Sequence, residues 1–289
     1  MSDDLPAALI ASIAELARRA GEKILEVYGH PLEVTRKTDT SPLTIADLRA
    51  HKVIVDGLAS ITPHVPVLSE EASDIPYETR KTWSRYWLVD PLDGTREFLS
   101  RNGEFTVNIA LIDQHVPILG VVYVPVRHTV YMGSRSGGAF RQVAEQSATP
   151  IHVREDPPVP LRVVGSRSHR SAEEERYLSR LEPYELVGVG SSLKFCLIAE
   201  GSADFYPRFG PTSEWDTAAA QAVVNAAGGA VIEIDGTPLR YNTRESLLNP
   251  HFLVFGDRTR NWRKEMGLAE ETSSPDSDSA FLPRSPGED

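Results

Sequence analysis

Four short β-rich segments follow one another closely in the first half of this 289-residue chain. They span 105–112, 118–124, 129–133 and 139–143, and only short turn signals separate them. Parallel strands need crossover connections of about a dozen residues or more, so strands joined by such short turns pair antiparallel. We therefore expect an antiparallel meander in this half of the protein.

Helical periodicity precedes the meander. Apolar residues three and four positions apart predict one helix over 9–27 and a second over 44–61. Two short apolar runs, at 65–69 and 86–89, predict strands that each end in acidic residues.

After about residue 150, strands and helices alternate. The pattern predicts strands at 161–164, 186–189 and 231–234, and helices at 172–181, 193–199 and 217–227. Such alternation is typical of an α/β layer. We expect an N-terminal α+β half over 1–150 and a C-terminal α/β half over 151–268. The Ser-, Pro- and acid-rich tail, 269–289, has few apolar residues and is predicted to be disordered.

Charge and cysteine content exclude several kinds of protein. The chain has 41 Asp+Glu, 30 Lys+Arg and a net charge of −11, so its surface repels nucleic acid polymers. A small anionic substrate is still compatible, because a bound cation can reverse the local sign. The single cysteine, Cys196, excludes an internal disulfide and a cysteine-based metal cluster.

No apolar run approaches the roughly 18 residues of a transmembrane helix. The acidic start, Met1-Ser2-Asp3-Asp4, does not resemble a secretory signal. We expect a cytoplasmic protein. Loose association with the inner face of the cell membrane and the oligomeric state are left open by the sequence.

A hydrophobic strand runs directly into an acidic segment at 87–98, WLVDPLDGTREF. Pro91 should break the strand ladder, and a short turn should then present Asp93 beside Asp90. Two carboxylates and a backbone carbonyl around one point would suit Mg²⁺, which prefers oxygen ligands. A helix expected from Thr95 offers N–H groups to a phosphate. The alternative is a plain turn with Asp93 as helix N-cap; the complete segment, at the end of a buried strand, favours the metal site.

Three further acidic positions fit the same site, and each has a structural alternative. Glu70-Glu71 ends a strand, where neighbouring side chains point opposite ways, so one of the two would face the site; on this pattern alone, a solvated strand end is the alternative. Asp216 stands where a helix N-cap belongs and can also present an oxygen to a metal. Thr44-x-x-Asp47 resembles a capping box, and on that pattern alone Asp47 is a cap rather than a catalyst.

Together, Glu70-Glu71, Asp90-Pro91-Leu92-Asp93-Gly94-Thr95 and Trp215-Asp216 resemble the lithium-sensitive, Mg²⁺-dependent inositol monophosphatase superfamily. The resemblance runs from the first helix to about Phe255. It implies the layered αβαβα sandwich of that superfamily, with the site between the two halves. Within the superfamily, the segments 164–169, 190–196 and 206–212 are more similar to the CysQ-type 3′(2′),5′-bisphosphate nucleotidases.

The resemblance also implies roles for the matched positions. Two to three Mg²⁺ ions would be held by Glu70, Asp90, the Leu92 carbonyl, Asp93 and Asp216. Deprotonation of the attacking water would be assisted by Asp47 and Thr95. Substrate contacts would come from Glu70, Leu92, Asp93, Gly94, Thr95, Ser191, Lys194, Arg208 and Asp216.

The implied reaction is hydrolysis of the 3′-phosphate of adenosine 3′,5′-bisphosphate to AMP and phosphate. Arg167, His169, Lys194 and Arg208 are candidates for binding the second phosphate, and each could instead be a surface charge. An inositol monophosphatase or a fructose-1,6-bisphosphatase would use the same metal site. The alternative from another class is a catalytically inactive regulatory protein that uses this fold for binding.

Overall fold

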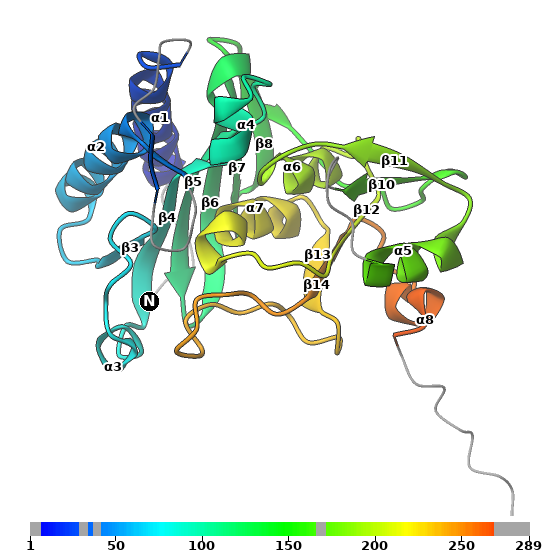
Figure 1. Ribbon diagram of the computed structural model, residues 1–289. Coiled ribbons are helices and arrows are strands. Elements are labelled where there is room, and N and C mark those ends of the chain that lie inside the picture. Colours follow the sequence, from blue (N-terminus) through cyan, green and yellow to red (C-terminus); the bar gives the residue numbers. More distant parts are fainter. Residues whose placement is uncertain (1–6, 29–33, 37–41, 166–171, 269–289) are drawn as a thin grey trace, which may run out of the picture.

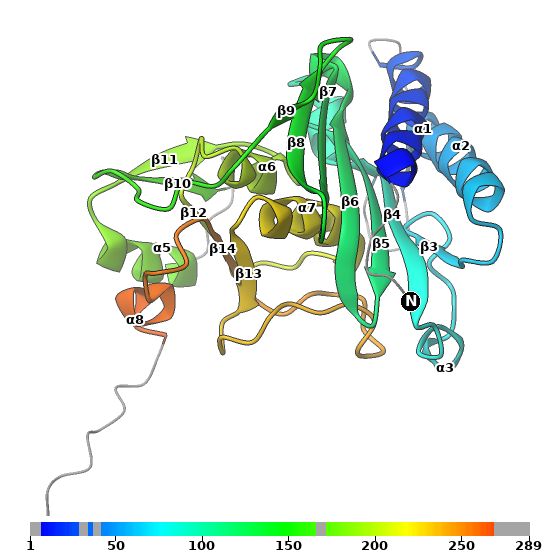
Figure 2. The ribbon, with the colours of Figure 1, turned by 180° about the vertical axis from the view of Figure 1, so that it is seen from behind.

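The computed structural model describes residues 7–28, 34–36, 42–165 and 172–268. In this part of the chain, helices and sheets alternate in layers (Figure 1). Helices α1 (Ala7–Leu25) and α2 (Ile45–Ile61) pack on the outer face of a seven-stranded sheet. Figure 2 shows these two helices on one face of the sheet and α7 (Glu214–Ala226) on the opposite face.

The seven-stranded sheet has the order β3-β4-β5-β6-β7-β8-β9. Every neighbouring pair is antiparallel except β3 with β4, so the expected meander is confirmed. The strands are β3 (Val67–Ser69), β4 (Arg85–Asp93), β5 (Thr106–Asp113), β6 (Val116–Val124), β7 (Thr129–Ser134), β8 (Gly138–Val143) and β9 (Thr149–Pro150).

The five-stranded sheet has the order β11-β10-β12-β14-β13 and mixes parallel with antiparallel pairs. Its strands are β10 (Leu161–Gly165), β11 (Tyr184–Gly188), β12 (Phe205–Arg208), β13 (Ala230–Glu233) and β14 (Phe252–Phe255). The sequence pattern did not predict β12 or β14. Both are only four residues long, and β12 contains a proline, which weakens the local strand signal.

Helices α6 (Leu193–Ala199) and α7 lie between the two sheets. Helices α5 (Ala172–Leu178) and α8 (Trp262–Met266) pack on the outer face of the five-stranded sheet. Together with α1 and α2, they complete the αβαβα order. The remaining short elements are β1 (Val34–Arg36), β2 (Pro42–Thr44), α3 (Tyr77–Arg80), α4 (Thr95–Leu99) and the 3₁₀ turns η1 (Pro125–Arg127) and η2 (Ser179–Leu181).

Alternation along the strands divides the core into three parts. On β4, Tyr86 and Leu88 are buried in the layer between the sheets. Their neighbour Trp87 is buried against α1 and α2 instead. On the second sheet, Tyr206 faces the middle layer, whereas Phe205 faces α8. Both sheets are therefore buried on both faces, and the middle layer joins the two halves of the chain.

Helix α7 lies unusually close to the first sheet. An ideal Cβ on Gly120 of β6 would lie 2.0 Å from the Ala219 carbonyl oxygen. A Cβ on Gly133 of β7 would lie 2.8 Å from the Val223 Cα. Glycine on the strands and alanine on the helix permit this approach, which carries the N-terminus of α7 to the end of β4.

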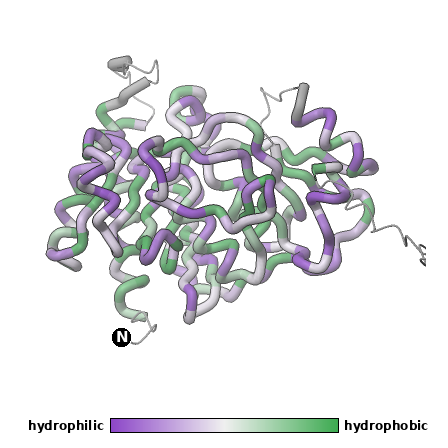
Figure 3. Tube along the Cα trace, turned by 90° about the horizontal axis from the view of Figure 1, so that it is seen from below, coloured by the Kyte–Doolittle hydropathy of each residue, from purple (hydrophilic) through white to green (hydrophobic). Residues whose placement is uncertain are grey.

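The layered fold expected from the resemblance is confirmed. The division at residue 150 stays a prediction, and the tail over 269–289 lies outside the described residues. Within the described part of the chain, no helix is long and apolar enough to cross a membrane. In agreement, Figure 3 shows short hydrophobic stretches interrupted by hydrophilic residues along the chain.

Candidate active site

The acidic segment at the end of β4 is a bulged strand. The strand continues to Asp93, and its register with β5 shifts between Asp90 and Asp93. The expectation that the strand ends before a short turn is therefore wrong: Pro91 lacks an N–H for the ladder, and the bulge absorbs it. The Leu92 amide donates to Asp90 Oδ1 at 3.0 Å, which orients that carboxylate. A role of the Leu92 carbonyl as a ligand stays a prediction.

Helix α4 begins directly after this bulge. Its N-cap is Gly94, with a φ of 89°, and not Asp93, so the alternative assignment of Asp93 as N-cap is wrong. This left-handed conformation favours glycine. A Cβ on Gly94 would also lie 3.2 Å from the Ser191 Cβ, so the glycine lets a segment of the second half approach Asp93.

Asp216 reaches the same place from the start of α7. The helix begins at Glu214 with Ser213 as N-cap, and Asp216 is the third helical residue. The expected N-cap assignment of Asp216 is thus wrong. The Ser213 amide donates to Asp216 Oδ2 at 2.9 Å in a capping box, so one carboxylate oxygen holds the helix start.

Asp90, Asp93 and Asp216 form a compact carboxylate cluster. Each offers an oxygen, and these oxygens lie within 4.8 Å of one another. Burial raises the pKa of Asp90 well above its usual value, and the charges of Glu70 and Asp93 add to the shift. Burial likewise raises the pKa of Asp93 to about 6 and raises that of Asp216. Carboxylates that raise one another's pKa in this way need a cation to remain ionised together.

In a chelating buffer, the melting temperature should fall as the pH rises from about 4 to about 6. The folded protein holds a proton on Asp93 up to a pKa of about 6, whereas the usual value is 3.8. Protonated Asp93 therefore contributes to the free energy of unfolding. This contribution is fully present below pH ~4 and is lost as the pH passes through ~6. Scanning calorimetry of Asp93→Asn, which cannot ionise there, should give a shallower fall. Parallel plots of melting temperature against pH for the two proteins would contradict the assignment of the raised pKa to Asp93.

Glu70 and Glu71 lie in the turn after β3, which ends at Ser69, and their charges act on different partners. The Glu70 amide donates to the Val89 carbonyl at 3.1 Å, which places Glu70 beside the end of β4. Its charge acts on Asp90 and Asp216. The charge of Glu71 acts instead on His51, whose pKa is lowered mainly by burial.

Asp47 is buried in the first turn of α2, and its charge contributes to the raised pKa of Asp90, after burial and nearer carboxylates. It is therefore near the cluster. Thr95 makes no side-chain hydrogen bond with any residue that the structure describes, so its pairing with Asp47 stays a prediction.

A polar network that the sequence analysis missed holds Asp93. The Ser192 amide donates to Asp93 Oδ2 at 2.6 Å, and the Asn108 amide group donates to the same oxygen at 3.4 Å. The Ser192 hydroxyl donates to Asn108 Oδ1 at 2.8 Å and also lies 2.8 Å from the Thr106 hydroxyl. All of these groups except Asp93 are buried. Polar residues at alternate positions of the apolar strand β5 were the available signal.

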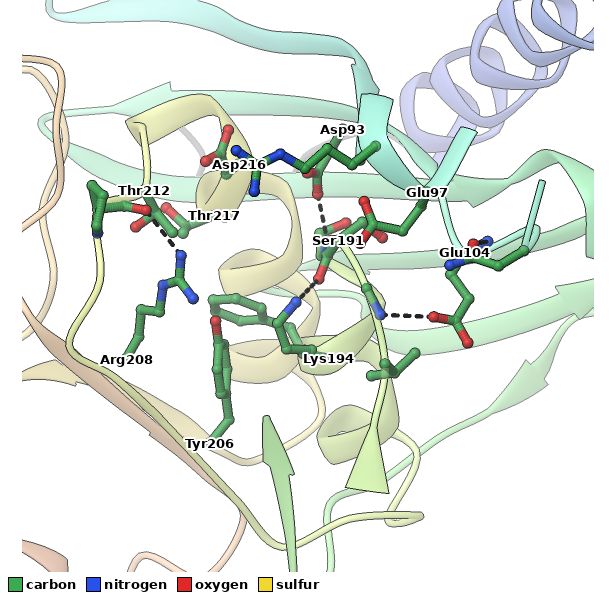
Figure 4. A pocket seen from close by; sticks show the side chains of 18 of the residues that line it. Asp93, Glu97, Glu104, Ser191, Lys194, Tyr206, Arg208, Thr212, Asp216 and Thr217 are labelled. Atoms are coloured by element: carbon green, nitrogen blue, oxygen red, sulfur yellow. Dashed lines mark hydrogen bonds between the residues drawn. The ribbon is translucent and has the colours of Figure 1, made fainter. Parts of the chain in front are cut away.

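A cavity of about 420 Å³ adjoins this cluster between the two halves of the protein. Figure 4 shows the side chains around it. Its walls include both acidic and basic residues, among them Asp93, Gly94, Glu97, Glu104, Ser191, Lys194, Tyr206, Arg208, Thr212 and Asp216. The substrate-binding residues expected from the second half therefore line one space with Asp93, Gly94 and Asp216.

Lys194 is buried, so the alternative of a surface lysine is wrong. Its Nζ donates to the Ser191 carbonyl at 2.9 Å and lies 5.7 Å from the Tyr206 ring centre. Burial lowers its pKa, and the Asp93 charge opposes that shift. Arg208 also lines the cavity and donates to the Pro211 carbonyl at 2.9 Å. The other two basic candidates, Arg167 and His169, lie outside the described residues.

Comparison with known proteins agrees with this geometry. The family model described as "Inositol monophosphatase family" matches residues 6–274, and the chain belongs to this family of phosphatases. The chain is 54% identical over 252 residues to the Escherichia coli K12 protein named 3′(2′),5′-bisphosphate nucleotidase CysQ, across 85% of this chain and 99% of that protein. The Haemophilus influenzae protein of the same name is 37% identical over 256 residues, across 88% and 95%.

Solved structures show the same relationship. The crystal structure of CysQ from Bacteroides thetaiotaomicron has a TM-score of 0.77 and 42% identity, and covers 87% of this chain and 98% of that one. The inositol monophosphatase TM1415 of Thermotoga maritima, at 21% identity and a TM-score of 0.74, shares the fold and covers 90% and 97%. The similarity to CysQ-type proteins expected from the sequence motifs is confirmed.

Proposed function

We propose that this protein is a Mg²⁺-dependent phosphatase that removes the 3′-phosphate of adenosine 3′,5′-bisphosphate, giving AMP and phosphate. The observation that carries the proposal is one cavity whose wall combines the carboxylates Asp93 and Asp216 with three cationic residues, Arg96, Lys194 and Arg208. A substrate with two phosphates can place one beside the metal-binding carboxylates and the other beside the cationic side chains. The names of the CysQ relatives support the same substrate class.

The donor set fits Mg²⁺. The Asp90, Asp93 and Asp216 oxygens are close together and mutually repulsive, with Asp90 buried and the other two half-buried, and carboxylate oxygens are the ligands Mg²⁺ prefers. We assign these three residues, Glu70 and the Leu92 carbonyl to two or three ions. When bound, Mg²⁺ would neutralise the phosphoryl oxygens and the leaving group.

The chain's own residues would position the reactants. Lys194 and Arg208 would bind the phosphate that is not cleaved, which fixes the other phosphate beside Asp93. Asp47, linked through Thr95, would accept the proton of the attacking water. Ser192 and Asn108 would keep the Asp93 carboxylate in a single orientation. Such catalysis consists mainly of positioning and charge neutralisation, as phosphoryl transfer requires.

A release assay for inorganic phosphate tests this proposal. The substrates are adenosine 3′,5′-bisphosphate, inositol 1-phosphate and fructose 1,6-bisphosphate, each with Mg²⁺ or with excess chelator. We expect kcat/KM to be at least roughly tenfold higher for the nucleotide than for inositol 1-phosphate, because a substrate with one phosphate loses a hydrogen bond to a charged group. Activity should vanish in chelator, and Li⁺ should inhibit where equal Na⁺ does not.

Other outcomes would change the assignment. A preference for inositol 1-phosphate or fructose 1,6-bisphosphate would point to the alternative phosphatases with the same metal site. No release from any substrate would favour the inactive binding protein. The cytoplasmic location expected from the sequence is part of the present proposal.

A further inference from the structure

The Glu97 carboxylate lies in the wall of the active-site cavity (Figure 4). Two glycines define its position. An ideal Cβ on Gly190 would lie 2.5 Å from the Glu97 Cγ, and one on Gly94 would lie 3.1 Å from Glu97 Oε2. The side chain therefore crosses the backbone of both glycines, in a place that only residues without side chains leave free. The conformation of the Glu97 side chain therefore follows from its packing against the backbone of Gly94 and Gly190.

This carboxylate has no hydrogen bond or ion pair with any residue in the described part of the chain. Its neighbour Glu104, by contrast, accepts a hydrogen bond from the Gly190 amide at 3.0 Å. The Lys194 ammonium donates to the Ser191 carbonyl instead of pairing with Glu97. Among the described residues, Glu97 is also outside the carboxylate cluster of Asp90, Asp93 and Asp216.

A carboxylate without a partner is unexpected in a cavity for anions. It repels phosphate, and loss of water around it is costly unless a donor replaces that water. An ionised carboxylate only accepts hydrogen bonds, so any partner that the substrate supplies is a donor on its neutral part. Such a partner would make the Glu97 charge useful for selecting the substrate.

The position of Glu97 identifies that donor. Glu97 lies against Gly94, the residue after Asp93, and its charge acts on both Asp93 and Lys194. In Figure 4, Glu97 and Arg208 lie on opposite sides of Ser191. Glu97 is therefore close to the Asp93 end of the cavity, where the phosphate to be cleaved would lie. On a ribose 3′-phosphate, the donor nearest to the reacting centre is the adjacent 2′-hydroxyl.

We propose that Glu97 is a specificity-determining residue that accepts a hydrogen bond from the ribose 2′-hydroxyl next to the scissile phosphate. This inference rests on the function proposed above. It adds a ribose-reading group to a site whose other contacts are made to phosphates and metal. A substrate lacking that hydroxyl should leave the Glu97 carboxylate without a donor.

The test compares adenosine 3′,5′-bisphosphate with its 2′-deoxy analogue in the wild type, Glu97→Gln and Glu97→Ala. A hydrogen bond to a charged group predicts that Glu97→Ala lowers kcat/KM for the ribose substrate roughly ten- to a hundredfold. Glu97→Gln should lose less, because its carbonyl still accepts. On the deoxy substrate, neither variant should lose activity, since the hydrogen bond is already missing and removal of the charge only relieves its repulsion of phosphate. The exposed Glu185→Gln on β11 is the matched control and should change neither rate.

Three results would overturn the inference. Equal losses on both substrates would show that Glu97 does not read the hydroxyl. A loss that disappears with inosine 3′,5′-bisphosphate, which lacks the adenine amino group, would assign Glu97 to the base. A higher Mg²⁺ concentration for half-maximal activity in Glu97→Gln would assign it to the metal. A wild type inactive on both nucleotides would overturn the proposed function itself, a result distinct from an active enzyme with equal losses.

Discussion

Asp93→Asn should lower kcat roughly a hundredfold or more. Removal of a group that only orients a metal ligand costs about ten- to a hundredfold, and loss of the ligand charge itself should cost more. The variant should still fold, because an asparagine oxygen can accept the hydrogen bonds that Ser192 and Asn108 donate to Asp93. Phosphate release at saturating substrate and Mg²⁺ measures the effect.

Melting curves distinguish a metal defect from a folding defect. In chelator, Asp93→Asn should melt no lower than the wild type, since one of three crowded carboxylates has been neutralised. Addition of Mg²⁺ should raise its melting temperature less than that of the wild type. The exposed Asp56→Asn on α2 serves as the control and should behave like the wild type. Full activity of the wild type in excess chelator would refute the metal assignment.

Lys194→Ala should raise KM for adenosine 3′,5′-bisphosphate roughly ten- to a hundredfold, the value of a hydrogen bond to a charged group. A substrate with one phosphate should be affected far less. The ammonium lies in the cavity wall beside Tyr206, where a second phosphate can reach it, and the Asp93 charge also acts on it. Steady-state kinetics on adenosine 3′,5′-bisphosphate and 3′-AMP measure the effect of Lys194→Ala on substrates with two phosphates and with one.

A second substitution separates charge from packing. Lys194→Met keeps an unbranched apolar stem beside Tyr206 and removes only the ammonium, so it should reproduce the KM effect of Lys194→Ala. The exposed Lys52→Ala should leave KM unchanged. Equal losses on both substrates would place Lys194 at the scissile phosphate. No loss on either would reopen the choice of substrate.

Much of the fold could be predicted because its signals are local. The 3.6-residue period identified α1 and α2, and short turns between apolar runs identified the meander of β5 to β8. Helix α6 was predicted with the bounds that the structure shows, Leu193–Ala199. The strands β12 and β14 escaped prediction because four residues carry too little pattern, and their pairing supplies the missing stability.

The candidate site shows a similar division. The acidic segment at Asp90 and Asp93 was recognised because several unusual residues stand together in the sequence. The alternative that Asp93 and Asp216 are helix N-caps is wrong, and the sequence could not settle it because a cap depends on where a helix begins, which neighbouring residues only partly decide. The network of Thr106, Asn108 and Ser192 was missed since its members are far apart in the chain.

By itself, the sequence determined which elements form and which residues carry the chemistry, because periodicity and motifs act over a few neighbouring positions. Only the tertiary structure decided which of those residues meet. Asp216 reaches Asp90 because Gly120 and Gly133 let α7 pack directly on the first sheet. The unpartnered carboxylate of Glu97 became visible only with Gly190 packed against it. These contacts join residues about 90 to 130 positions apart, and their geometry follows from the close packing of whole layers rather than from any local pattern.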